Sequence, residues 1–139
     1  MKTNFYLAGL AGGVFNFFLG WLVYGILLMS FMEANTIKYE GLSKEMPDML
    51  LLSLSCLATA FFLAFIFEKW AKIATLKGGF VGGLIIGLFI CVIYDLSFLS
   101  MYNLFNKTMA VVDILVGGVM YGATGAVVGW VLSTGKKTE

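Results

Sequence analysis

Hydrophobic residues are gathered into four long runs along this chain, and polar residues fill the segments between them. The runs cover residues 5–31, 49–67, 78–105 and 109–132. A transmembrane helix needs about 20 mostly apolar residues, since each residue advances an α-helix by about 1.5 Å and the hydrocarbon core is about 30 Å thick. The pattern therefore predicts an all-α membrane protein with four transmembrane helices. No soluble domain or linker interrupts it, so we expect residues 1–139 to form a single four-helix bundle.

The distribution of lysines predicts the orientation of these helices. Six lysines lie at the two termini and in the second connection: Lys2, Lys69, Lys72, Lys77, Lys136 and Lys137. The other two connections together hold three: Lys38, Lys44 and Lys107. By the positive-inside rule, both termini are expected in the cytoplasm. The third connection is only a few residues long, so the last two helices should be antiparallel neighbours.

The composition excludes several classes of function. Only 12% of the residues are charged, against about 25% in soluble domains, which supports the membrane assignment. The chain has no His and no Arg, which rules out a Ser-His-Asp triad and a His-ligated zinc site. A net charge of +1 argues against nucleic acid as a partner.

The two cysteines do not indicate a metal or redox centre. Cys56 and Cys91 both lie within apolar runs and form no CxxC motif. Buried free thiols behave as small hydrophobic side chains. We therefore expect no metal, no cofactor and no disulfide framework.

Small residues recur at helical spacing in three of the four runs. These glycines are Gly9, Gly13 and Gly20 in the first run, Gly79, Gly83 and Gly87 in the third, and Gly118, Gly122, Gly125 and Gly129 in the fourth. In lipid, close approach of backbones across small residues supplies much of the helix packing. Two interpretations stay open: the glycine faces build the bundle itself, or at least one of them binds a second copy or a membrane partner. The run 49–67 has no glycine and four phenylalanines, so we expect that helix to face lipid the most.

Two carboxylates interrupt the apolar runs. An ionisable group costs about 2.5–3.5 kcal/mol at mid-bilayer, and such a residue is by default a candidate functional residue. Asp95 lies 17 residues after Gly78, about 25 Å along a helix that runs outward. Asp113 lies four residues after Met109, about 6 Å along the returning helix. Counted this way, both carboxylates lie at the same depth, near the outer face.

Other polar side chains reach a similar depth and complete a candidate cluster. Tyr24 arrives there from the first run, while Tyr94 and Ser97 flank the first carboxylate. On a helix, Tyr94 shares the side of the glycines and is expected to face the packed interface. Asp95 and Ser97 point apart, so Ser97 is the member that fits the cluster least. Its alternative is a hydroxyl bonded to its own helix backbone.

Each polar residue in these runs also has a purely structural interpretation. Asn16, in the middle of the first run, is expected to hydrogen-bond a neighbouring helix, although contact with a ligand or ion is also considered. Asp113 lies in a first helical turn, where it could cap the helix or pair with Lys107.

Three functions are compatible with this arrangement. Two carboxylates in a low-dielectric site do not readily both ionise, which suits reversible binding or translocation of a proton, a small cation or another small solute. The alternative is a non-catalytic structural or accessory subunit, or a homo-oligomeric scaffold, packed through its glycine faces. The third is an intramembrane aspartyl enzyme with Asp95 and Asp113 as its dyad. Tyr94-Asp95 is similar to the first motif of intramembrane aspartyl proteases, but their Gly-x-Gly-Asp and Pro-Ala-Leu motifs are absent. We therefore expect no enzyme activity and assign no catalytic residue.

The segment 76–132 resembles an uncharacterised bacterial family of small four-helix membrane proteins, classed only as a domain of unknown function. The resemblance is carried by Tyr94-Asp95-Leu96-Ser97 in the third helix and by Val112-Asp113-Ile114 with Gly117 in the fourth. The chain departs from the family pattern at Phe98, where the family has Asn, and at Val116, where it has Trp. Residues 19–25 are similar to the first helix of a second such family. The resemblance implies a multi-pass protein of the bacterial inner membrane and brings no activity with it.

Overall fold

The computed structural model describes residues 3–135, and all of its regular elements are helical. In chain order they are α1 (Thr3–Leu22), the short π-helix η1 (Val23–Leu27), α2 (Met29–Asn35), α3 (Met49–Phe65), the π-helix η2 (Ile66–Ala71), α4 (Leu76–Met101) and α5 (Lys107–Thr134). Lys2, Lys136 and Lys137, which contributed to the predicted orientation, lie outside the described residues.

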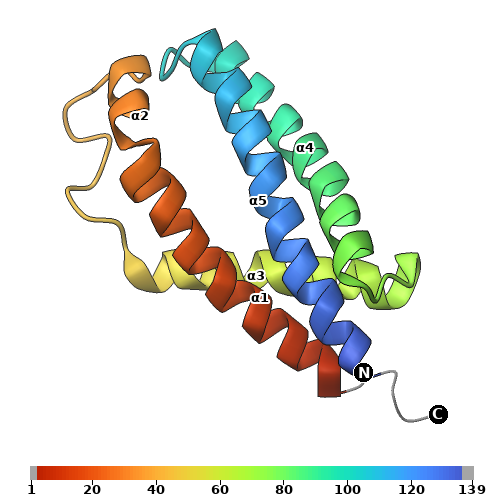
Figure 1. The fold of residues 1–139 in the computed structure, drawn as a ribbon. Helices are drawn as coiled ribbons and strands as arrows, with labels where there is room; N and C mark the ends of the chain where they lie inside the picture. The colour runs from red at the N-terminus through yellow and green to blue at the C-terminus, as the bar shows by residue number, and fades with distance from the viewer. Residues whose placement is uncertain (1–2, 136–139) are drawn as a thin grey trace.

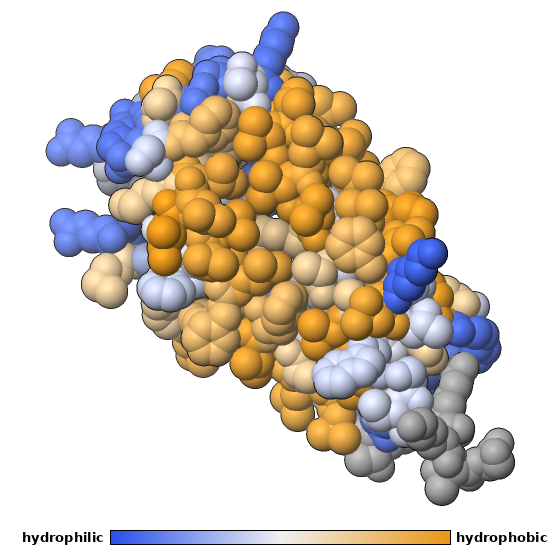
Figure 2. All heavy atoms as spheres, viewed as in Figure 1, coloured by the Kyte–Doolittle hydropathy of each residue, from blue (hydrophilic) through white to orange (hydrophobic). Residues whose placement is uncertain are grey.

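Four helices are long and apolar enough to cross a membrane, as predicted from the hydrophobic runs. They cover Asn4–Leu27, Met49–Ala71, Leu76–Met101 and Lys107–Thr134. The molecule has an apolar belt with polar residues gathered at both of its ends, as a multi-pass membrane protein requires (Figure 2). The prediction of an all-α chain with four such helices is confirmed.

The four helices divide into a close pair and a crossing pair (Figure 1). α4 and α5 run side by side in opposite directions. α1 lies against α5 near its start and diverges from it toward α2, while α3 crosses behind both. We call the end that carries α2 and residues 102–106 the loop end. The opposite end, where α1 and α4 begin and α5 finishes, is the terminal end.

Polar side chains at the first residues set where three of the helices begin. Asp48 accepts hydrogen bonds from the backbone amides of Leu50 and Leu51 at the start of α3. Thr75 and Asn106 cap α4 and α5 in the same way. Such caps satisfy amide groups that have no partner within the helix.

Two predicted runs are shorter as helices than as hydrophobic stretches, and both differences occur at the loop end. The first run divides at Leu28, where φ is −101° and ψ is 0°, so that α2 becomes a separate helix. The third run forms α4, which ends at Met101 because residues 102–106 turn to pair with the chain after α2. Thr36 and Phe105 form an antiparallel bridge, and Ile37 donates to the Leu104 carbonyl at 2.7 Å.

The glycines of α4 and α5 lie against each other. A Cβ atom at Gly79 would overlap the carbonyl oxygen of Gly125, and one at Gly83 would overlap the carbonyl of Tyr121. The ring of Tyr121 covers Gly87. The remaining contacts along this seam place Gly118 against Leu88, Gly122 against Phe80, and Gly129 against the carbonyl of Thr75. Backbone meets backbone in this pair, which is the packing that small residues permit.

The glycines of α1 accommodate α3. Phe61 lies on Gly9, and Leu57 lies on Gly13. Gly20, farther along, has more room, since an added Cβ would come no closer than 3.7 Å to the methyl group of Met120.

The buried core lies toward the terminal end, and α3 with η2 supplies half of it. Its members are Phe5, Ala8, Ala60, Leu63, Ala64, Phe67, Val128 and Leu132. The expectation that residues 49–67 face lipid the most is therefore wrong for the second half of that helix. The reason is geometric, because a helix that crosses behind two others buries the part at the crossing, whether or not it contains glycine.

Candidate functional site

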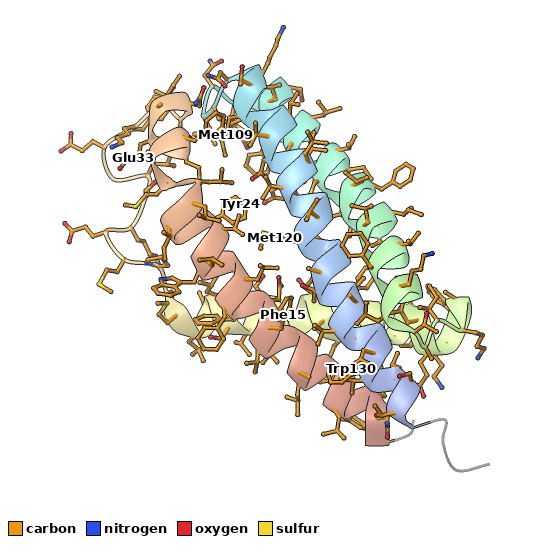
Figure 3. All side chains as sticks on the ribbon, in the orientation of Figure 1. Phe15, Tyr24, Glu33, Met109, Met120 and Trp130 are labelled. Carbon is orange, nitrogen blue, oxygen red and sulfur yellow. The ribbon has the colours of Figure 1, made fainter. Side chains whose placement is uncertain are left out.

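A hydrogen bond between two distant helices marks the candidate site. The hydroxyl of Tyr24 donates to Oδ1 of Asp113 at 2.7 Å, and both side chains are partly buried. Tyr24 belongs to the π-helical segment η1 and extends from it toward α5 (Figure 3). The bond joins η1 and α5 where the two helices have begun to diverge, so it closes the bundle near the loop end.

Asp95, in α4, lies near the Asp113 carboxylate. It is only 6% exposed, and its Oδ2 is buried without a hydrogen-bond partner among the described residues. Its carboxyl group is close enough to that of Asp113 for the two to interact electrostatically. A buried polar atom without a partner costs free energy, so an open carboxylate oxygen needs an explanation. Two neighbouring carboxyl groups are a setting in which a proton or a cation can be shared.

The seam between α4 and α5 determines which way Asp95 points. Gly79, Gly83 and Gly87 touch α5 at four-residue intervals, and continuing the interval leads to Cys91 and Asp95. The sulfur of Cys91 indeed lies on Gly117 of α5. Packing of ridges formed by every fourth residue is a common mode of helix contact. Asp95 is thus the last position of the line that holds the two helices together.

The predicted inward orientation of Tyr94 is wrong. Tyr94 is 62% exposed, and its ring stacks on that of Phe98 with centroids 4.7 Å apart. The prediction assumed that the contact face runs straight along the helix from Gly83 and Gly87. A line of every fourth residue instead winds around the helix by about 40° at each step, and this winding turns Asp95 inward and Tyr94 outward.

Ser97 and Asn16 also lie apart from the carboxylates. The Ser97 hydroxyl donates to the Ile93 carbonyl of its own helix at 2.6 Å, the structural alternative considered for it. Asn16 makes the expected interhelical contact, since its Oδ1 accepts a hydrogen bond from the hydroxyl of the fully buried Thr124 at 3.2 Å. The site that the structure assembles therefore consists of Tyr24, Asp95 and Asp113.

Neither structural alternative for Asp113 is found. The cap of α5 is Asn106, whose Oδ1 accepts from the amide of Met109 at 2.8 Å. Within residues 3–135 the ion pair present joins Lys38 to Glu33 at the exposed surface, and Lys107 takes no part in one. The carboxylate is thus held by the tyrosine rather than by the end of its own helix.

Cys91, which was expected to be only a small hydrophobic residue, is a neighbour of the site. Its thiol is close enough to Asp95, Asp113 and Tyr24 to interact with them electrostatically. The signal was present in the chain, because Cys91 precedes Asp95 by one helical turn.

The acceptors of the site are two carboxyl groups and one phenol, with no third carboxylate, cysteine or histidine placed beside them among the described residues to hold a metal ion. Residues 3–135 contain no group of three or more His, Cys, Asp or Glu side chains placed to hold a metal ion. Two carboxyl groups and one phenol supply acceptors for a single small cation, and each carboxyl can carry a proton. No protein-family model, no curated protein and no solved structure matches this chain.

Proposed function

We propose that this protein reversibly binds a proton or a small cation at Asp95 and Asp113, as one step in moving it across the membrane. The observation that carries the proposal is Oδ2 of Asp95, which is buried and has no hydrogen-bond partner within residues 3–135, in a carboxyl group that lies near that of Asp113. Ionisable residues inside a membrane protein characteristically mark the path of an ion.

Tyr24 has a defined part in this proposal. Its hydroxyl supplies a donor to one oxygen of Asp113, so that carboxyl group keeps a fixed orientation toward Asp95. A cation or proton that enters the pair reduces the repulsion between two carboxylates in a low-dielectric setting. Loss of that ion restores the repulsion, so binding is coupled to the separation of the two carboxyl groups.

We further propose a bacterial inner-membrane location with both termini in the cytoplasm. Lys69 in η2, Lys72 directly after η2 and Lys77 in the first turn of α4 lie at or next to the terminal end. Basic residues favour the cytoplasmic side. In that orientation the carboxylate pair lies nearer the outer face, since it is close to the loop end.

The alternative of an accessory subunit or homo-oligomeric scaffold depended on glycine faces open to a second chain. The glycines of α4 and α5 are covered by each other, and Gly9 and Gly13 are covered by α3. These contacts leave the alternative with less support than ion binding.

Ion flux into proteoliposomes tests the proposal. The full chain is reconstituted in vesicles of phosphatidylethanolamine and phosphatidylglycerol that contain a proton-, Na⁺- or K⁺-sensitive dye, with the matching ion gradient applied in turn. Asp95→Asn is expected to reduce the flux about tenfold, which corresponds to about 1.4 kcal/mol of lost ion binding. Glu40→Gln, which removes an exposed acid from the connection between α2 and α3, is the matched control.

Two results would overturn the proposal. One is flux in Asp95→Asn equal to that of the wild type when circular dichroism shows that the variant is folded. The other is wild-type flux no greater than that of empty vesicles under all three gradients.

A further inference from the structure

A second polar site lies at the terminal end, away from the carboxylate pair. There the start of α1, the helix η2, residues 72–74 and the end of α5 enclose a cavity of about 260 Å³. Its apolar walls include Phe5, Phe67 and Leu132, all buried. The volume lies just below the range of small-molecule sites, about 300–1,000 Å³, so it suits a small organic group.

Glu68 is the acidic residue that lines this cavity. Its Oε2 atom is buried and has no hydrogen-bond partner among the described residues. Glu68 and Asp95 are the residues of this part of the chain that have such an atom. A desolvated carboxylate oxygen normally has a donor or a cation as its partner, and residues 3–135 supply none to Glu68 Oε2.

Neither side-chain donor that lines the cavity reaches the carboxylate of Glu68. The ammonium group of Lys72 donates to the backbone carbonyl of Glu68 at 3.2 Å and not to its carboxylate. Lys72 has a left-handed backbone with φ of 53° at the end of η2. The amide nitrogen of Asn4 donates to Thr134 Oγ1 at 3.1 Å and to the Val131 carbonyl at 3.4 Å. The carboxylate of Glu68 therefore receives no hydrogen bond from the described side chains that line the cavity.

We propose that this cavity binds a primary ammonium group attached to a short apolar body, with Glu68 as the counter-ion. The ammonium supplies up to three donors and a positive charge, and the aromatic wall formed by Phe5 and Phe67 attracts cations as well as alkyl groups. The same chemistry occurs in a free alkylamine and in the headgroup of an ethanolamine lipid, and the position at one end of the apolar belt is accessible to both. This site is independent of the proposed ion site near the loop end.

Binding of n-butylammonium to the full chain in phosphatidylcholine nanodiscs tests this proposal. Trp70, exposed and two residues from Glu68, provides a fluorescence signal, and calorimetry gives a second measurement. We expect saturable binding with Kd of about millimolar, as so few atoms can supply. Butan-1-ol, which has the same size and no charge, should bind at least about tenfold more weakly, because a hydrogen bond to a charged group is worth about 1.5–3 kcal/mol.

Two variants locate the site. Glu68→Gln should weaken n-butylammonium about tenfold, and Ala74→Leu should do so by filling the cavity while leaving the carboxylate in place. Glu33→Gln, an exposed acid at the loop end, should bind as the wild type does.

A comparison of nanodiscs with and without phosphatidylethanolamine identifies the source of the ammonium group. Nanodiscs that contain phosphatidylethanolamine should suppress n-butylammonium binding if the lipid headgroup occupies the cavity, and should leave it unchanged if the ligand is a free amine. The proposal is overturned if n-butylammonium does not saturate in phosphatidylcholine. Equal affinities for the amine and the alcohol, or wild-type affinity in folded Glu68→Gln, would also overturn it. Loss of ion flux through the carboxylate pair would leave this result unaffected.

Discussion

Tyr24 and Asp113 are 89 residues apart in sequence, and their side chains meet at 2.7 Å. The contact joins the first and last membrane-spanning helices where the ribbons separate toward the loop end (Figure 1). The hydrogen bond thus orients a side chain of the candidate ion site and also holds the first and last helices together.

Tyr24→Phe should destabilise the protein by about 1–3 kcal/mol, because it leaves a carboxylate oxygen without its donor. The free energy of unfolding in a mixed-micelle denaturant titration measures the loss. Tyr39→Phe is the control, since it removes a 3.0 Å bond from the Tyr39 hydroxyl to the exposed Asn103 carbonyl, where water replaces the donor. Equal losses in the two variants would contradict the role given to Tyr24.

Gly83→Ala should destabilise the pair α4 and α5 by more than about 2 kcal/mol, because the added methyl group meets the backbone of Tyr121, which has little room to move. Thermal unfolding in detergent measures the effect. Gly20→Ala should leave stability unchanged or raise it by up to about 1 kcal/mol, since there is space at Gly20 and alanine favours a helix. A folded Gly83→Ala variant as stable as Gly20→Ala would show that the seam is looser than described.

Asn16 and Thr124 should show a coupling energy of about 0.6–1.7 kcal/mol in a double-mutant cycle made with Asn16→Leu and Thr124→Val. The reason is the 3.2 Å hydrogen bond from the threonine hydroxyl, which lies away from water. The four proteins are compared by denaturant titration in one detergent. Strict additivity of the two single losses would indicate that the bond contributes nothing.

Asn106→Ala should cost about 1–2 kcal/mol, because the side chain of Asn106 caps α5 and also donates to Asn35 Oδ1 at 2.7 Å. Hydrogen exchange at the first turn of α5 should increase with the loss of the cap. Asn103→Ala, in the same connection, serves as the control because only its backbone carbonyl makes the bond to Tyr39. Similar exchange in both variants would argue against capping by Asn106.

The sequence predicts depth in this fold better than it predicts direction. Counting residues from the helix ends brought Asp95, Asp113 and Tyr24 to one level, since the rise of an α-helix is constant. The orientation of Tyr94 could not be obtained that way, because it depends on how α4 winds against α5.

The pattern of apolar residues also could not predict the burial of two other parts of the chain. The burial of Leu63 and Phe67 follows from the crossing of α3 behind two other helices, and a run of apolar letters does not reveal a crossing. The position of Glu68, just after the end of the apolar run 49–67, gives no sign of burial, because a carboxylate at such an edge is ordinarily solvated. Its buried oxygen depends on α1 and α5, which are distant in sequence.

The backbone-to-backbone seam between α4 and α5 has a consequence for how the carboxylates are reached. Where Gly79, Gly83 and Gly125 meet, backbone contacts backbone with no side chain between, so we expect the two helices to move as one rigid body. Asp95 and Asp113 both belong to that body. In the proposed function, an incoming ion is therefore expected to reach the pair by displacement of α1, and the π-helical segment Val23–Leu27 is the expected hinge.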